Sequence, residues 1–322
     1  MFAIKVDNER ACKIEDINTL SLPVEQGILW LHLEGEMDAV RQWLDKHFTI
    51  DADTADALCD ELTRPRLFLN VNDELVLTVR ALRFDDENQS HMVSIRALIS
   101  ENFLLTLSYV EIPAVTAVAK NLLTKSRGIR SPHHILDRLC ELLSDHITTH
   151  ITELDESLAE LEDEWESKRH LDLDELHNLR LNTSRIRRHL MPQMEAFSRL
   201  NNVLKERISN KNDRQSHLAH WRELVNAIKR DMEAATDISE RVMILRDALQ
   251  QSTNEATNRI MYFLSVVATF FLPLTFVASL LGMNVSGIPA NDKPWAFWGV
   301  CGLMLALTLF QWLLFKRWRW LK

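Results

Sequence analysis

The sequence predicts an α+β cytoplasmic domain, a long helical stalk and two C-terminal transmembrane helices. Two uncharged runs near the C-terminus, residues 260–281 and 295–315, carry most of this prediction. The first run has 22 residues, enough to cross a bilayer core of about 30 Å at about 1.5 Å per residue. Only 13 residues separate the two runs. This pattern is typical of a membrane hairpin with a very short external turn.

The charges beside the two runs orient the hairpin. The tail, residues 316–322, carries four basic residues, whereas the turn, residues 282–294, carries only Lys293, which Asp292 offsets. Positive charge stays on the cytoplasmic side of a membrane, so we expect the tail to be cytoplasmic. A hairpin returns the chain to its starting side. Residues 1–259 and both termini are therefore expected in the cytoplasm, with the turn on the outer, periplasmic side.

The composition of residues 1–259 excludes several functions. This part holds 32 basic and 45 acidic side chains, a net charge of −13. So acidic a body argues against nucleic-acid binding, which requires a basic surface, and is compatible with a surface that attracts cations. With seven glycines, the chain contains no phosphate-binding loop or nucleophile elbow. We therefore expect neither an enzyme nor a bound cofactor.

Residues 1–130 are predicted to form a mixed α/β domain. Apolar or alternating runs rich in β-branched residues predict strands, and runs between them with helical periodicity predict helices. The predicted strands are residues 2–6, 28–33, 75–84, 91–99 and 103–109. The predicted helices are residues 37–48, 51–62 and 114–125. We expect a sheet with helices on its faces.

Residues 131–212 are predicted to form a helical hairpin. Ser131 as the cap and Pro132 at the first position begin a helix that extends to about Lys168. Within it, residues 153–166 hold eight carboxylates, and the helix that follows is rich in arginine. Charge pairing between the two helices explains this pattern most simply. Attraction of cations by the acidic face is the alternative.

A third helical stretch, residues 213–281, forms the stalk and continues through the first transmembrane run without a stop signal. One line along it steps by three and four residues, so its members share one side of the helix, and none is basic. The line begins with Asp237, Glu240 and Ile244 and ends at Gly282. Between them it contains Asp247, Gln251, Asn254, Asn258, Met261, Ser265, Ala268, Leu272, Thr275 and Ser279. Several copies of this side around an axis would line a channel with oxygen ligands for cations.

Parts of this stretch also suit roles that involve no channel. Ser265, Ala268, Ser279 and Gly282 are small enough to serve close helix packing alone. Pro273 leaves a carbonyl near residue 269 unpaired, which predicts a hinge, an exposed pore carbonyl or a tolerated kink, and we favour the kink. The polar line continues before the apolar run, through Asn258, Asn254 and Asp247, and this continuation favours the channel.

Pairs of histidines at helical spacing are candidate metal ligands. His146 and His150 are four residues apart, and His217 and His220 are three apart. Zinc prefers imidazole or thiolate ligands, so both pairs are candidates for a zinc site. Two ligands are too few for a tight site, and the chain has twelve histidines. Surface or helix-contact roles are therefore the favoured alternative.

The run FLPLTF at 271–276, followed by Gly282, Met283 and Asn284 at the membrane exit, resembles the CorA family of divalent-cation transporters. The segment TRPR at 63–66 also resembles the cytoplasmic domain of that family, and the resemblance covers essentially the whole chain. It implies a funnel-shaped homopentamer in which the first span lines a central pore. It also implies that Asn284 forms the ring at the outer entrance, beside Gly282 and Met283.

The turn after this triplet departs from the magnesium-transporting members of the family. Leu281 stands where they usually carry an aromatic residue, and the run GIP at 287–289 resembles the ZntB branch, the zinc transport proteins of the family. That branch implies zinc transport across the bacterial inner membrane, with proton-linked uptake. A magnesium or cobalt channel of the same family is the nearest alternative. A membrane-anchored helical scaffold that moves no ions is the remote one.

Overall fold

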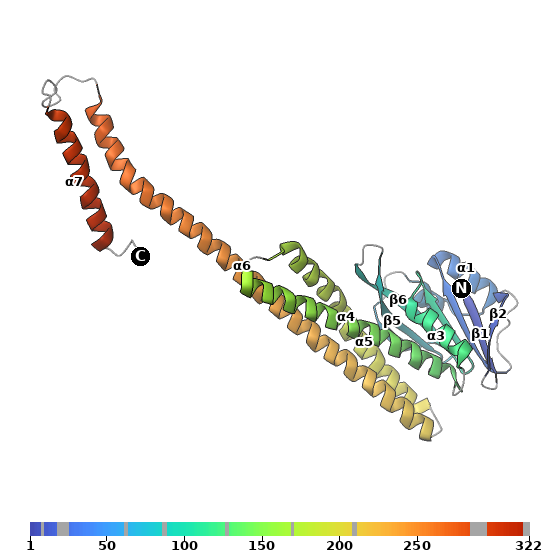
Figure 1. The fold of residues 1–322 in the computed structure, drawn as a ribbon. Helices are drawn as coiled ribbons and strands as arrows, with labels where there is room; N and C mark the ends of the chain where they lie inside the picture. The colour runs from blue at the N-terminus through green and yellow to red at the C-terminus, as the bar shows by residue number, and fades with distance from the viewer. Residues whose placement is uncertain are drawn as a thin grey trace. The chain divides into compact units, whose positions relative to one another are not determined.

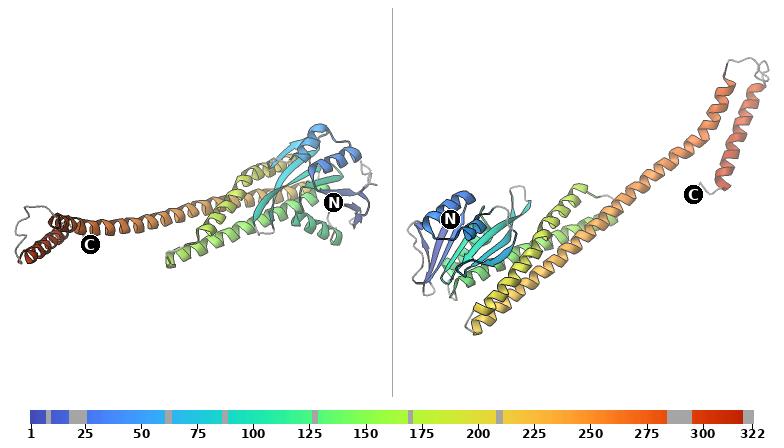
Figure 2. Two further views of the ribbon diagram at one scale, coloured as in Figure 1. Left: turned by 90° about the horizontal axis from the view of Figure 1, so that it is seen from above. Right: turned by 180° about the vertical axis from the view of Figure 1, so that it is seen from behind.

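The chain divides by its internal contacts into two compact units, an N-terminal unit of Met1–Ile244 and a C-terminal unit of Leu245–Lys322. The computed structural model describes residues 1–7, 10–17, 26–60, 64–85, 89–125, 129–168, 171–207, 211–283 and 295–317. Figure 1 shows the elements along the chain, and Figure 2 shows them from two further directions.

A seven-stranded sheet forms the centre of the N-terminal unit, in the order β2-β1-β3-β7-β6-β5-β4. The strands are β1 Phe2–Asp7, β2 Arg10–Ile14, β3 Ile28–Glu34, β4 Arg66–Leu69, β5 Leu75–Phe84, β6 Ser90–Ile99 and β7 Phe103–Ser108. β3 and β7 are parallel, and all other neighbours are antiparallel. The five predicted strands are confirmed. β2 and β4 were not predicted. β2 is mostly exposed and lacks an apolar pattern, and β4 has only four residues, too few to show a period of two.

Seven helices are described. They are α1 Met37–His47, α2 Ala52–Cys59, α3 Pro113–Thr124, α4 Pro132–Lys168, α5 Leu173–Arg207, α6 Lys211–Leu281 and α7 Ala296–Arg317. Each predicted helix is confirmed to within a few residues. α1 and α2 cover one face of the sheet, and α3, α4 and α5 cover the other, so the N-terminal unit has three layers (Figures 1 and 2).

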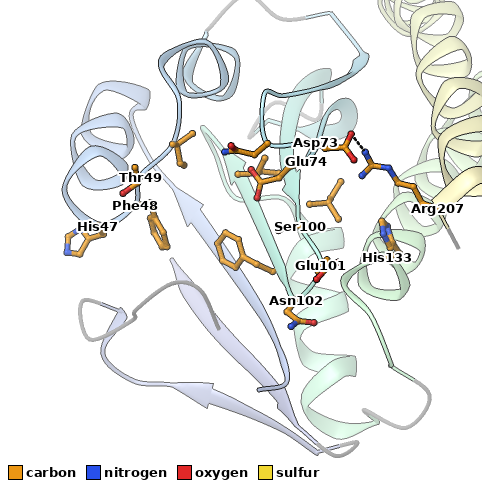
Figure 3. A pocket seen from close by; sticks show the side chains of 15 residues that line it. His47, Phe48, Thr49, Asp73, Glu74, Ser100, Glu101, Asn102, His133 and Arg207 are labelled. Atoms are coloured by element: carbon orange, nitrogen blue, oxygen red, sulfur yellow. Dashed lines mark hydrogen bonds and ion pairs between the residues drawn. The ribbon is translucent and has the colours of Figure 1, made fainter. Parts of the chain in front are cut away.

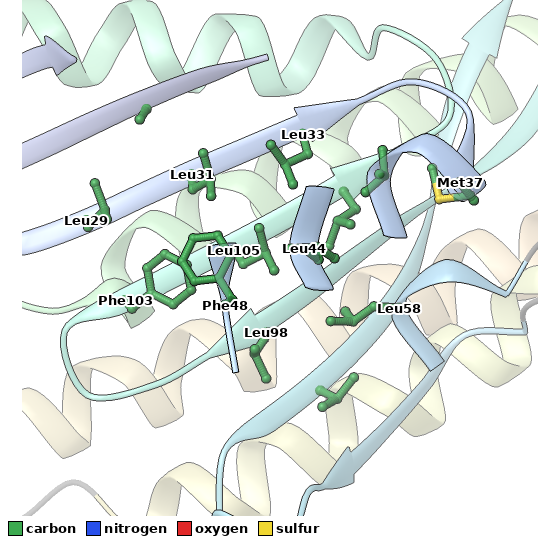
Figure 4. Packing of buried hydrophobic residues seen from close by; sticks show 14 residues of the cluster. Leu29, Leu31, Leu33, Met37, Leu44, Phe48, Leu58, Leu98, Phe103 and Leu105 are labelled. Carbon is green, nitrogen blue, oxygen red and sulfur yellow. The ribbon is translucent and has the colours of Figure 1, made fainter. Parts of the chain in front are cut away.

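The core beneath α1 and α2 is built from alternate residues of the central strands (Figure 4). Leu29, Leu31 and Leu33 of β3 are at most 2% exposed. Phe48, just after α1, stacks on Phe103 of β7 with ring centroids 5.8 Å apart. Each buried side chain of this size contributes about 1.5–3 kcal/mol relative to exposure. The period-two alternation of the strand sequences therefore holds the sheet against these helices.

Trp221 joins the three long helices of the N-terminal unit. Its fully buried ring packs edge-on against Phe197 of α5, with centroids 5.1 Å apart. Its indole Nε1 donates a hydrogen bond to Asp137 Oδ1 of α4 at 2.9 Å. The apolar ring is thus buried while its N–H keeps a partner, as buried tryptophan requires.

The acidic part of α4 is held by an arginine of α6. Arg241 Nη1 lies 2.6 Å from Asp155 Oδ1, and its Nη2 lies 2.5 Å from Glu162 Oε2. The hydrogen bond with Glu162 is the main cause that raises the pKa of Arg241. Among the described residues no ion pair joins α4 to α5. The predicted pairing of the acidic helix with the arginine-rich helix is therefore wrong, because α6 supplies the cation.

A buried acid forms a second polar contact between α4 and α6. Thr148 Oγ1 donates to Asp231 Oδ2 at 2.9 Å, and Asp231 is 4% exposed. Burial raises the pKa of Asp231 from 3.8 to about 6. The folded state therefore binds this proton more tightly than the unfolded state does. The contribution of Asp231 to stability is full below its ordinary pKa and is lost as the pH rises through about 6.

We expect Arg241→Met to lower the midpoint of thermal unfolding by about 2–4 °C, because the carboxylates of α4 lose their shared cation while the apolar stem is kept. Far-ultraviolet circular dichroism of the detergent-solubilised protein measures this shift. Arg222→Met is the control, since Arg222 is exposed on the same helix and makes no ion pair with any described residue. Equal midpoints for the two variants would contradict the ion-pair role.

Candidate ion-conducting face

The part of the predicted line from Asp247 to Ser279 lies along one exposed side of α6 in the C-terminal unit. α6 is a single helix of 71 residues that includes this part of the line. Every member is exposed, including the apolar Met261 at 60% and Leu272 at 68%. This side, named the open face, consists of Asp247, Gln251, Asn254, Asn258, Met261, Ser265, Ala268, Leu272, Thr275 and Ser279.

The opposite side of α6 packs against α7. Phe270 stacks on Phe315 of α7, with ring centroids 5.4 Å apart. The half-buried residues of this side are Val266, Val267, Phe270, Pro273, Leu274 and Val277. At about 100° per residue, their centre lies about 180° around the helix from the centre of the open face. No described residue of the C-terminal unit therefore covers the open face, so it is free to meet other copies of the chain.

Oxygen atoms dominate the polar chemistry of the open face. Ser265 Oγ donates to the Met261 carbonyl at 2.8 Å and keeps its lone pairs as acceptors. Asn254 Oδ1 accepts a hydrogen bond from Gln250 Nε2 at 3.2 Å, on the exposed part of the helix. Asp247 adds an exposed carboxylate. Hydroxyl, amide and carboxylate oxygens are ligands for hydrated or partly hydrated cations.

The carbonyl next to Pro273 has a partner on α7. Proline has no N–H, so the carbonyl of Thr269, four residues earlier, loses its bond within the helix. Gln311 Nε2 donates to this carbonyl at 3.2 Å. The prediction of an unpaired carbonyl is therefore wrong, because a second helix supplies the donor. Because this carbonyl is bonded to α7, it does not belong to the open face. The arrangement favours the tolerated kink.

The exit of α6 is described as far as Met283. The N–H of Gly282 donates to the Ala278 carbonyl at 2.9 Å, which extends the helical bonding past Leu281. A Cβ at Gly282 would lie 3.2 Å from the same carbonyl, so a side chain there would require a shift of a few tenths of an ångström. Met283 is 49% exposed. Asn284, the predicted entrance residue, lies outside the described residues, so its role remains a prediction.

The first histidine pair makes contacts within the N-terminal unit. His150 is buried, and its Nδ1 lies 3.0 Å from Glu153 Oε2. Its ring packs edge-on against Phe84 of β5, with centroids 5.0 Å apart. His146 is half-buried. These contacts favour a helix-contact role for His150.

The second histidine pair lies near the start of α6. His217 is buried, and its Nδ1 lies 2.5 Å from Asp137 Oδ2 of α4. His220 is half-buried. Across the described residues, no group of three or more histidine, cysteine, aspartate or glutamate side chains is arranged to hold a metal ion. Metal binding by His146, His150, His217 and His220 therefore remains a prediction without structural support.

A hollow of about 1200 Å³ lies at one end of the sheet (Figure 3). An ion pair between Arg207 Nη2 and Asp73 Oδ1, at 2.6 Å, lies along its wall. Burial lowers the pKa of His133, which also lines it, to about 4. Glu74 and Glu101 add acidic groups. The lining thus holds three carboxylates and one guanidinium, and Asp73 is already paired with Arg207. None of these side chains belongs to a group that, among the described residues, is arranged to hold a metal ion.

α6 and α7 are both long and apolar enough to cross a membrane. One strongly apolar stretch lies within Arg214–Leu281 and another within Phe297–Arg317, and neither stretch is buried. So much exposed apolar surface is costly in water and suits contact with lipid. A three-layer α/β unit, a long helix with an exposed apolar end and a second exposed apolar helix define a class of membrane-anchored proteins.

Comparison with known proteins identifies the family within that class to which the chain belongs. The family described as CorA-like Mg²⁺ transporter protein matches residues 25–317, and the chain belongs to this family. The divalent cation transporter CmaX of Pseudomonas aeruginosa is 31% identical over 304 residues, 93% of this chain and 89% of the relative. The zinc transport protein ZntB of Pectobacterium atrosepticum is 27% identical over 295 residues, 91% of this chain and 88% of the relative.

A solved structure supports the same assignment. The structure of the full-length CmaX protein matches with a TM-score of 0.81 at 28% identity, covering 99% of this chain and 98% of that chain. The fold is therefore CorA-like over its whole length. The chain is a divalent cation transporter of the CorA family.

Replacing a hydroxyl of the open face by an apolar group tests whether this side conducts. We expect Thr275→Leu to lower divalent-cation flux in proteoliposomes by about tenfold or more, because an apolar constriction loses water. Thr275→Ser retains the hydroxyl and should keep most of the flux. Unchanged flux in Thr275→Leu would indicate that the open face serves packing instead.

Proposed function

We propose that this protein transports zinc across a bacterial inner membrane, through a central pore lined by the open faces of five α6 helices. The observation that best supports this proposal is the open face itself, an oxygen-bearing side of α6 that points away from α7. A pentamer is the assembly that the resemblance to the CorA family implies. Relatives named as zinc transport proteins match over 91% of the chain, which favours zinc as the cargo.

The chemistry of the open face suits passage rather than storage. Its side chains offer hydroxyl and amide oxygens with a single carboxylate, Asp247, and it includes no basic residue. Zinc binds imidazole and thiolate much more tightly than such oxygens. A zinc ion that keeps part of its water shell would therefore be attracted without being trapped. Conduction requires this balance between entry and release.

The proposed topology places the N-terminal unit and the C-terminal tail in the cytoplasm, with residues 282–294 in the periplasm. Asn284 then forms a ring of amide oxygens at the outer entrance, beside Gly282 and Met283. Basic residues in the tail and their scarcity in the turn support this orientation. Protons are proposed to accompany zinc inward.

A magnesium or cobalt channel is the second candidate. The relative CmaX, at 31% identity, is named a divalent cation transporter without a stated ion. Oxygen ligands are also those that magnesium prefers, so the open face by itself suits either ion. Only the relative fluxes of the two ions distinguish these candidates.

Zinc flux into proteoliposomes should exceed magnesium flux at equal concentration, and Asn284→Ala should lower zinc flux by about tenfold or more, since the entrance loses its amide oxygens. Ion-selective dyes inside the vesicles measure both fluxes. Asn291→Ala, in the same turn, is the matched control and should retain flux. Magnesium flux above zinc flux would favour the second candidate, and absence of any flux would favour a scaffold.

Proton coupling predicts a dependence on the pH gradient. Zinc uptake should rise when the outside is made about one pH unit more acidic than the vesicle lumen, because proton entry then drives the ion. Reversing the gradient should slow uptake, and a protonophore should remove the difference. Equal rates under both gradients would exclude coupled proton transport while leaving zinc transport intact.

A further inference from the structure

The gap that Pro273 makes in α6 lies in the part of the helix that is apolar enough to span a membrane. The Thr269 carbonyl loses its usual donor there, and water is scarce in a bilayer core. An unpaired carbonyl is costly in such surroundings. The chain therefore needs a donor from another element at this depth.

Gln311 of α7 supplies that donor. Its Nε2 donates to the Thr269 carbonyl at 3.2 Å, and the residue is half-buried. Thr308, a turn earlier on α7, bonds instead to the Met304 carbonyl of its own helix at 2.9 Å. Gln311 thus differs from Thr308 in that its polar group reaches across to α6.

Packing beside this hydrogen bond holds the two helices together. Phe270, next to Thr269, stacks on Phe315, one turn after Gln311, with centroids 5.4 Å apart and an interplanar angle of 23°. Both rings are half-buried. The stack brings α7 close to the proline gap, so the amide reaches the carbonyl without the help of water.

We propose that Gln311 is a positioning residue, whose amide replaces the backbone donor missing at Pro273 and so fixes the course of α6 at this point. Ala268 and Leu272 of the open face precede the gap, and Thr275 and Ser279 follow it. The hydrogen bond therefore sets how these two parts of the face are aligned. Its effect on transport rests on the proposed function, whereas its effect on stability does not.

A double-mutant cycle tests this role, because Pro273→Ala restores the backbone N–H to α6. Gln311→Met keeps the length of the side chain and removes the donor. It should lower the midpoint of thermal unfolding by about 2–4 °C in the wild-type background and leave it unchanged in the Pro273→Ala background. Cation flux should fall severalfold in Gln311→Met, and the substitution should have little further effect when added to Pro273→Ala.

Two further variants separate hydrogen bonding from packing. Thr308→Val removes a polar group that bonds within α7, so any shift it causes should be the same in both backgrounds. Gln311→Glu can donate to the carbonyl only as the neutral acid, so its midpoint, relative to wild type, should rise as the pH falls. This variant remains informative if Gln311→Met does not fold.

The outcomes distinguish this inference from the proposed function. Equal shifts for Gln311→Met in both backgrounds, or no shift in either, would overturn the positioning role. Coupling in stability without zinc flux in any variant would retain that role and reject zinc transport. Zinc flux without coupling between Gln311 and Pro273 would support zinc transport and reject the positioning role.

Discussion

The pairing of backbone polar groups in a layer without water is the constraint on which the C-terminal unit depends. A helix satisfies it internally, which is why the membrane-compatible part of α6 continues as a helix to Leu281. Pro273 breaks the pattern at one carbonyl, and the amide of Gln311 restores it from outside the helix. α7 therefore completes the hydrogen bonding of α6 in addition to adding apolar surface. With α7 on one side of α6, the opposite side remains open for other copies of the chain.

Much of the fold follows from local pattern. Uncharged length predicted both apolar helices, and the alternation of residues such as Leu29 and Leu31 predicted the central strands, since burial on a pleated surface requires it. The edge strand β2 escaped prediction because its exposure removes that requirement, and β4 escaped it because four residues are too few to show the pattern. The partner of the acidic part of α4 was also misassigned. Arg241 lies 86 residues from Asp155, and only the packed helices bring them together.

For the candidate site, spacing predicted which residues share a side of α6 but not what covers the other side. That Phe270 and its neighbours face α7 is a tertiary fact, and it makes the open face a surface distinct from the contact with α7. For the histidines, in contrast, spacing did not predict the contact. His217 is three residues from His220, but it is buried beside Asp137 of α4 and contacts that residue. The sequence offered one hint for Gln311, a side-chain amide within an otherwise apolar run. That this amide meets the carbonyl freed by Pro273 depends on how the two helices align.

The ion pairs of Arg241 also determine which carboxylates of the acidic part of α4, residues 153–166, face solvent alone. Arg241 pairs with Asp155 and Glu162, which are seven residues apart and so lie on one side of the helix. The carboxylates of this part that have neither an ion pair nor a hydrogen bond among the described residues are Glu156, Glu160, Asp163 and Glu166, all exposed. Such carboxylates hold counter-ions as a diffuse, rapidly exchanging atmosphere that thins within about 8 Å at physiological ionic strength. The surface of α4 would thus enrich every cation in its vicinity by valence, and leave discrimination between metals to other parts of the protein.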